Sequence, residues 1–260
     1  VPQSFLLPDL LAEDSTISIF NEALRLTGLC DSLRQYIDPT YSCGEDSVNQ
    51  DMIISTGGSS YTMRYVGTRM KRYTAFVETD EVYAANGIHD LDDLKAHAKQ
   101  VYDQMFPKDA GLYDDDWTNR KNPLNRFISY HLLPYYGAYN DWTVSGDIKN
   151  TCAKTDLIDC TDWYTTMLQG TIMKMSTPSD GLFINRKGVG ARYTVRGTKV
   201  LSPSEIGDVD QQALNGIYHY IDQVLDYNQE TRDVVFNDRI RVMAATLSPE
   251  FMNCGARGNT

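Results

Sequence analysis

The 260-residue sequence lacks the segments that would place it in a membrane or mark it for export. No apolar run approaches the ~20 residues that a membrane-spanning helix needs. The first residues, Val1, Pro2 and Gln3, form neither a basic region nor the start of a long apolar one, so we expect no signal sequence within this chain. Hydrophobic residues nevertheless make up 42% of the chain, which is enough for a substantial core.

Positive charge is scarce. The chain has 24 Lys and Arg against 35 Asp and Glu, for a formal net charge of −11. Nucleic acids and anionic lipids are bound by clusters of Lys and Arg. The charge balance therefore argues against both as partners, without identifying the right partner.

Cysteine is also sparse, and its spacing excludes the commonest zinc motif. The five cysteines are Cys30, Cys43, Cys152, Cys160 and Cys254. No two of them form a Cys-x-x-Cys pair, so we expect no zinc site. Cys152 and Cys160 flank a short polar segment and could close a disulfide loop; the alternative is five free thiols. The count does not decide the redox compartment.

The common signatures of catalysis are missing. The sequence contains no Gly-x-Ser-x-Gly, no His-Glu-x-x-His and no Gly-x-x-x-x-Gly-Lys. Asp114 and Asp116 resemble the start of a calcium loop, but the later glycine and glutamate of that loop are absent. We therefore predict no catalytic residue, no metal and no cofactor.

The hydrophobic pattern changes from helical to strand-like along the chain. Asp14 or Ser15, Asp90 and Asn122 each precede apolar residues at helical spacing and can cap a helix. Strand-like segments are 73–78 and, after a long loop at 134–160, several short runs from Trp163 onward. Helices first and strands later predict an α+β fold rather than an alternating one.

Four histidines could support acid–base chemistry: His89, His97, His131 and His219. His131 lies on the apolar face of a predicted helix. His219 alternates with Ile217 and Ile221, and we predict that this face of the strand is buried. Both placements favour a structural role over catalysis.

Aromatic residues concentrate in the polar loops, beside carboxylates and amides. Such rings can stack on sugars or anchor a protein interface, and the alternative is that they fold down over the core. The candidate binding residues are Tyr113, Trp117, Tyr135, Tyr136, Tyr139 and Trp142.

Three segments together resemble the conserved blocks of fasciclin domains. The stretch "YTAFVETDEVYAANGI", residues 73–88, is similar to the first block. The residues that occupy its characteristic positions are Thr74, Phe76, Thr79, Asp80 and Tyr83. Glu78 stands where the family usually has proline, and Val82 where it usually has alanine.

The other two blocks lie further along the chain. "RFISYHLLP", residues 126–134, resembles the central Tyr-His block and supplies Tyr130 and His131. "NGIYHYIDQVL", residues 215–225, resembles the second conserved block. Its matching residues include Asn215, Gly216, His219 and Asp222.

The resemblance implies an α+β fold, a β-sandwich wedge with the N-terminal and central helices packed at one edge. It implies a fasciclin-like domain over residues 1–228, with insertions near 40–70, 107–121 and 138–162. Residues 229–260 would be a C-terminal tail or the start of a following module. The motif residues are expected to be structural.

The resemblance also implies a non-enzymatic adhesion or binding domain, extracellular or at the cell surface. The tail at 237–251 is similar to a continuation seen in larger fasciclin-containing lipoproteins of bacterial glycan-uptake loci, and this predicts an outer-membrane lipoprotein whose lipid anchor lies outside this chain. The expected partner is an extracellular glycan or a surface or matrix protein, bound through the inserted aromatic loops. The alternatives are a carbohydrate-active enzyme that uses loop carboxylates and a purely structural spacer.

Overall fold

The computed structural model describes most of the chain. The described residues are 5–42, 51–56, 59–64, 67–142, 160–178, 180–189, 192–207 and 211–237. The α-helices are α1 (Leu7–Glu13), α2 (Ser18–Leu26), α3 (Leu29–Arg34), α4 (Asp80–Ala85), α5 (Leu91–Met105), α6 (Pro123–Tyr130), α7 (Tyr139–Trp142) and α9 (Pro203–Ile206). A 3-10 turn, η1 (Ser15–Ile17), and a π-helical turn, η3 (Thr231–Val235), accompany them.

The strands fall into one large sheet and two hairpins. The strands of the large sheet are β3 (Tyr73–Glu78), β4 (Leu132–Leu133), β5 (Cys160–Thr165), β6 (Ile172–Thr177), β7 (Leu182–Ile184), β10 (Thr198–Val200), β11 (Gln212–Ala213) and β12 (Gly216–Ile221). The hairpins are β1 (Asp51–Thr56) with β2 (Ser59–Arg64), and β8 (Lys187–Val189) with β9 (Arg192–Val195).

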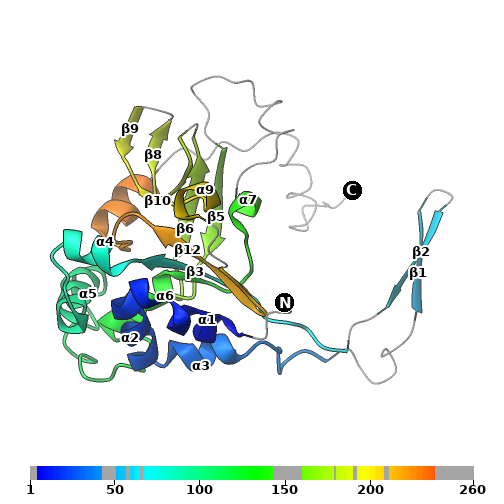
Figure 1. Cartoon of the computed structure of the whole chain (residues 1–260), viewed down its shortest axis with the longest axis horizontal. Helices are drawn as coiled ribbons and strands as arrows, with labels where there is room; N and C mark the ends of the chain where they lie inside the picture. Colours follow the sequence, from blue (N-terminus) through cyan, green and yellow to red (C-terminus); the bar gives the residue numbers. More distant parts are fainter. Residues whose placement is uncertain are drawn as a thin grey trace, which may run out of the picture.

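The large sheet is mixed and nearly closes on itself. Its strand order is β4-β3-β12-β10-β7-β6-β5, with β11 beside β12. β3 and β12 run parallel, whereas the other pairs are antiparallel. Just after β5, the Met167 amide donates to the Leu132 carbonyl in β4 at 2.8 Å, so the two ends of the sheet meet. Helices α1, α2, α3, α5 and α6 gather on one side of this sheet (Figure 1), and the predicted α+β class is confirmed.

Local capping explains where helices α5 and α6 begin. Asp90 accepts a hydrogen bond from the Asp93 amide at the start of α5, and Asn122 accepts from the amides of Leu124 and Asn125 at the start of α6. Both helices are predicted from sequence. The predicted helix after Asp14 is also present as η1 and α2, with Asp14 accepting from the Thr16 amide.

Helix α1 was not predicted from the sequence. It begins after Leu6 without a side-chain cap, although Pro8 and Asp9 in its first turn are typical of a helix start. Leu7 and Leu11 are fully buried, which indicates that packing against the rest of the fold stabilises this helix.

Strand β12 is buried on both faces, whereas one buried face was predicted. Ile217 and His219 lie in the core as expected. Tyr218 and Tyr220 point the other way and are also buried, and both hydroxyls donate to Asp14 Oδ2. The N-terminal segment therefore covers the face that the strand alternation left for solvent.

The predicted insertions are only partly described. The first contains the β1–β2 hairpin, which stands apart from the large sheet in Figure 1. The second, at 107–121, is a series of turns. Within the predicted loop at 134–160, the chain forms the short helix α7. Residues 143–159, which include Cys152, lie outside the described part.

The segment after β12 packs back onto the sheet as far as residue 237. The rings of Phe236 and Trp163 lie 5.1 Å apart, and Lys187 donates to the Val234 carbonyl at 2.6 Å. Residues 238–260 lie outside the described part, so the boundary expected at residue 228 stays a prediction. In the described segments, none of the helices combines the length and the apolar composition needed to cross a membrane.

Candidate functional site

Asn215 is a joint of the fold. Its side chain accepts the Leu7 amide of α1 at 2.8 Å and donates to the Leu33 carbonyl of α3 at 2.6 Å. Its own carbonyl accepts the Tyr73 amide of β3 at 2.9 Å. The residue is fully buried, so these bonds tie three elements together and leave no group for a ligand.

The motif residues of the first block also act as internal joints. Thr74 donates to the Tyr135 carbonyl at 2.8 Å and accepts the Gly137 amide at 2.9 Å. Asp80 accepts the amides of Ser18 and Ile19 at 3.1 and 3.0 Å, and so caps α2 from a distant point of the chain.

His131 forms a fully buried polar pair with Glu78. Its Nε2 lies 2.8 Å from Glu78 Oε1, and its Nδ1 lies 2.8 Å from the Phe127 carbonyl. A carbonyl only accepts, so Nδ1 must carry a proton. The pair therefore holds one further proton between Nε2 and Glu78, and an ionised Glu78 requires His131 to be an imidazolium.

Other donors complete the environment of Glu78. Its carboxylate accepts the Tyr83 hydroxyl and the Leu225 amide, both at 2.9 Å. Burial lowers the pKa of His131, but the charge of Glu78 and the hydrogen bonds to Glu78 and Phe127 outweigh it, and the pKa is raised overall. The Glu78–His131 pair joins β3 to α6 inside the core, where a substrate has no access.

His219 is also internal, but it is neutral. Its Nε2 donates to the Gly137 carbonyl at 2.8 Å, and its ring stacks on Phe76 with centroids 5.7 Å apart. Burial lowers the pKa of His219 to about 4. His131 and His219 are therefore both packing residues of the core. Tyr130 likewise donates from the core to the Ile172 carbonyl at 3.2 Å.

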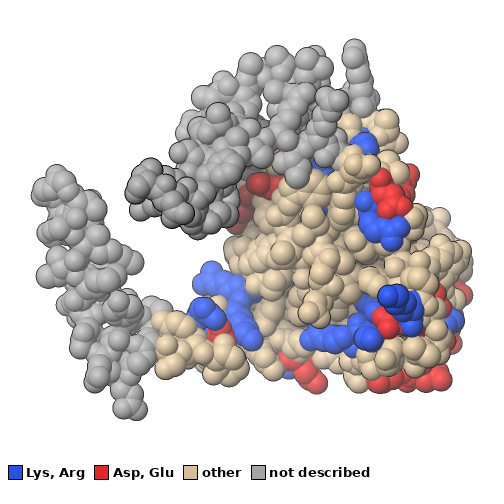
Figure 2. All heavy atoms as spheres, turned by 180° about the vertical axis from the view of Figure 1, so that it is seen from behind, with Lys and Arg blue, Asp and Glu red and all other residues tan. Residues whose placement is uncertain are grey.

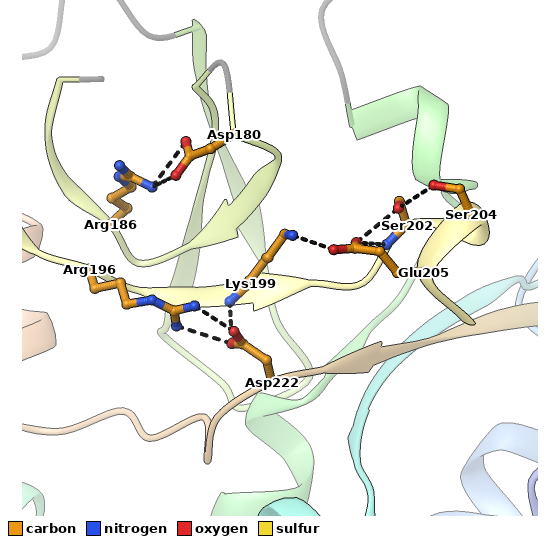
Figure 3. Close-up of polar contacts among 8 residues, drawn as sticks. All are labelled: Asp180, Arg186, Arg196, Lys199, Ser202, Ser204, Glu205 and Asp222. Carbon is orange, nitrogen blue, oxygen red and sulfur yellow. Dashed lines mark hydrogen bonds and ion pairs between the residues drawn. The ribbon is translucent and has the colours of Figure 1, made fainter. Parts of the chain in front are cut away.

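Asp222 belongs to a charged network on β10 and β12 (Figure 3). It accepts the Lys199 amide at 2.8 Å and pairs with Arg196 at 2.6 Å. The Lys199 ammonium turns the other way and pairs with Glu205 at 2.5 Å, while Glu205 also accepts the Ser202 amide in a capping box. The network orders the start of α9 against the sheet.

The burial of an arginine in this region could not be predicted from the sequence. Arg186 is 1% exposed, and its guanidinium lies 4.3 Å from the ring centroids of both Phe183 and Tyr193. It also pairs with Asp180 at 3.3 Å (Figure 3). An arginine between two aromatic faces suits a structural clamp, but the ring contacts come from two strands and cannot be read from local sequence.

The pairing of His97 with Asp226 could not be predicted from local sequence either. His97 of α5 lies 3.0 Å from both carboxylate oxygens of Asp226, which follows β12. The hydrogen bond to Asp226 outweighs burial and raises the pKa of His97. The partners are 129 residues apart in sequence.

Of the six aromatic candidates, Trp142 is buried and the other five are only partly buried. Trp142 is 6% exposed, its indole N–H donates to the Gly137 carbonyl at 3.1 Å, and its ring lies 4.7 Å from Tyr164. Tyr135 also packs against Trp142, at 6.2 Å between ring centroids. Trp142 is therefore a core residue whose ring faces are covered. It fits the alternative in which the loop aromatics fold over the core and do not bind a partner.

Tyr136 and Tyr139 remain half-exposed at the surface. The Arg72 guanidinium lies 5.8 Å from the Tyr136 ring. Burial raises the pKa of Tyr139, in α7, and the charge of Glu205 raises it further. The Tyr139 ring also packs partly against the core.

Tyr113 and Trp117 belong to the 107–121 loop. The ammonium of Lys121 lies 5.4 Å from the Tyr113 ring centroid, and that of Lys95 lies 4.9 Å from the Trp117 ring centroid. Trp117 lines a surface pocket of about 170 Å³ together with residues of α5 and α6. We call this the Trp117 pocket; its other charged lining residues are Lys95, Lys99, Asp114 and Asp115.

A second pocket, of about 250 Å³, lies among α1, α2 and α3 and is lined by Arg25, Cys30 and Arg34, among other residues. Arg34 pairs with Asp9 at 2.6 Å. Burial raises the pKa of the Cys30 thiol, which disfavours the reactive thiolate. This pocket therefore offers no activated nucleophile.

The described surface shows no broad basic field on the face drawn in Figure 2. There, Lys and Arg lie in small groups with Asp or Glu beside them. Within the described ranges, no group of three or more His, Cys, Asp and Glu side chains is arranged to hold a metal ion.

Comparisons with known proteins find likenesses among solved structures. No family model matches the sequence, and no curated protein matches it. Among solved structures, the chain is similar to the FAS1 domain pair from the insect cell adhesion molecule fasciclin I, with 12% sequence identity and a TM-score of 0.43. The alignment covers 89% of this chain and 53% of that one, so the chain spans about half the length of its neighbour.

Proposed function

We propose that this chain is a non-enzymatic binding domain that recognises a glycan or a protein partner through aromatic side chains on its loops. The observation that carries the proposal is a difference between the motif residues and the loop aromatic residues. The residues of the three sequence blocks are committed to internal hydrogen bonds, whereas Trp117, Tyr136 and Tyr139 stay half-exposed on connecting segments. Loops on a rigid scaffold are the usual place for recognition.

The buried histidines support binding over acid–base catalysis. His131 and His219 are 0% and 2% exposed, and their hydrogen bonds are made to groups of the fold. A general base must reach a proton of the substrate within hydrogen-bond distance. Neither histidine can do so without opening the core.

The loop carboxylates provide little evidence for glycosidase activity. That chemistry needs two carboxyl groups that face each other across the scissile bond, about 5 to 9.5 Å apart. Asp114 and Asp115 are adjacent in sequence, and Asp114 is engaged by Lys99 at 2.5 Å. We therefore place them in recognition rather than in hydrolysis.

We further propose that the domain works outside the cell or on its surface, as part of a larger lipoprotein. The resemblance of the sequence blocks and of the tail supports this setting. The residues that precede Val1 in the gene test it directly. A signal peptide followed directly by a lipidation cysteine is the expected result, and a cytosolic start would overturn the setting without affecting the binding proposal.

Binding is tested with the purified chain on a glycan array and on immobilised matrix proteins. Trp117→Ala, Tyr136→Ala and Tyr139→Ala are compared with the unaltered chain. Leu112→Ala is the matched control, because Leu112 lies in the same loop as Trp117, is 67% exposed and does not line the pocket. We expect at least one aromatic variant to lose binding at an unchanged melting temperature. Full retention by all three would refute the proposal.

A further inference from the structure

The Trp117 pocket is held in shape by buried amides. Asn122, which is fully buried, donates from Nδ2 to the carbonyls of Tyr113 and Asp114 at 2.8 and 3.1 Å. Asn125, 1% exposed, donates to the Trp117 carbonyl at 3.1 Å. Asn122 caps α6 and Asn125 lies in its first turn, so the backbone that carries Asp114 and Trp117 is anchored to a buried helix. A site anchored in this way loses little freedom when a ligand binds.

The lining combines a ring face with both kinds of hydrogen-bonding groups. Lys95 and Lys99 supply ammonium donors, Asp114 and Asp115 supply carboxylate acceptors, and the indole of Trp117 supplies a flat apolar surface. Asp114 uses Oδ2 for Lys99, and its Oδ1 is buried without a hydrogen-bond partner. The exposed carboxylate of Asp115 therefore supplies the acceptor beside the aromatic ring.

The formal charges of these four side chains cancel. An anionic ligand would meet two carboxylates on a chain of net charge −11, and a cationic ligand would meet two ammonium groups. A neutral ligand that both donates and accepts hydrogen bonds fits this balance best. Many hydroxyl groups around an apolar C–H face meet that description.

The size of the pocket limits the ligand to one ring. Its volume is about 170 Å³. A cavity of about 150 Å³ is known to admit a six-membered ring such as benzene. One pyranose ring is therefore the unit that fits, with the rest of a chain extending into solvent.

We infer that the Trp117 pocket binds a single neutral sugar ring, the terminal residue of a glycan. The inference rests on the proposed binding function and names its ligand class. The sugar stacks its C–H face on Trp117, where the Lys95 ammonium now lies. That ammonium already contacts Asp92 at 2.8 Å, so it keeps a partner when the sugar displaces it from the ring.

The test uses the intact chain and neutral methyl glycosides of glucose, galactose, mannose and N-acetylglucosamine. Binding is followed through the tryptophan indole N–H signals in NMR, with the Trp117 signal assigned from its loss in Trp117→Phe. Glucuronate and glucosamine serve as charged counterparts. We expect at least one neutral glycoside to shift the Trp117 signal and to bind about tenfold more tightly than its charged counterparts.

Variants separate the pocket from the rest of the surface. Trp117→Ala and Asp115→Asn should weaken this binding by about tenfold, while Leu112→Ala leaves it unchanged. Because Trp117 also touches the core, Trp117→Phe provides a folded variant that retains a smaller platform and intermediate affinity. An unchanged affinity in Trp117→Ala would overturn the inference.

The outcomes distinguish this inference from the proposed function. If glycans bind but only Tyr136→Ala or Tyr139→Ala weakens binding, the pocket assignment fails and the binding function stands. If only matrix proteins bind, the sugar ligand fails and the binding function again stands. If no glycan or protein binding depends on any of the three rings, both fail.

Discussion

The Nε2 atom of His131 lies 2.8 Å from Oε1 of Glu78, and both side chains are fully excluded from solvent. This pair stands in two of the sequence blocks, and Glu78 occupies a position where the fasciclin pattern usually has proline. Phe127, Tyr83 and Leu225 contribute further hydrogen bonds to this network. The unusual Glu78 is therefore fully paired within the fold.

Glu78→Gln should strongly destabilise the protein. The substitution removes the counter-charge of His131 but leaves its buried ring, and breaking a buried ion pair on one side costs about 3 to 5 kcal/mol. Urea unfolding measures the change in the free energy of unfolding. The control is Glu81→Gln, since Glu81 is an exposed glutamate on α4 and should change stability by less than about 0.5 kcal/mol. Equal stability of the two variants would contradict the paired role of Glu78.

The contribution of His131 should fall as the pH rises. Its pKa is raised in the folded protein above its ordinary 6.5, so the folded state binds the proton more tightly than the unfolded state does. The stabilisation is then complete below pH 6.5 and is lost as the pH rises through the raised pKa, with a limiting slope of about 1.4 kcal/mol per pH unit. The difference in the free energy of unfolding between the unaltered protein and His131→Gln, measured in urea across the pH range, should shrink as the pH rises. His97 titrates in both proteins and cancels.

His219 should show the opposite pH dependence. Burial lowers its pKa to about 4 from 6.5, so the unfolded state binds the proton more tightly. Its stabilisation is present above pH 6.5 and is lost as the pH falls toward 4. His219→Gln keeps an N–H for the Gly137 carbonyl without a titrating ring. The variant should therefore lose less stability than the unaltered protein between pH 6.5 and pH 4. Parallel curves would contradict a buried neutral imidazole.

Gly216→Ala should also disrupt the core. An added Cβ would lie 2.7 Å from the Tyr73 carbonyl of β3 and 2.8 Å from a Leu7 methyl group. The carbonyl belongs to the adjacent parallel strand and cannot move freely, so we expect a loss near the upper end of the overpacking range, about 3 kcal/mol. Gly67→Ala is the control, because nothing lies within 4 Å of its added Cβ. Thermal unfolding of the two variants should differ by several degrees, and matching midpoints would refute the close approach at Gly216.

The sequence predicted what depends on neighbouring residues. The caps at Asp90 and Asn122 act on amides two or three residues away, so they are visible in a short window. The strand at 73–78 contains the strand-forming residues Tyr73, Thr74, Phe76 and Val77, and it forms as β3. The aromatic loops were recognised by composition, which reveals residue type but does not reveal which rings are covered.

The tertiary structure decided everything that depends on partners remote in the chain. Composition alone placed Trp142 among the binding rings, yet helix α7 turns it inward beneath Gly137, where the added Cβ of any other residue would overlap the indole. Glu78 and His131 are 53 residues apart, and they meet because α6 leads into β4, which pairs with β3. Local propensity and capping are set over a few residues, and the sequence determined those. The burial of a side chain and its charge partner depend on strand order and helix packing, which only the folded chain supplies.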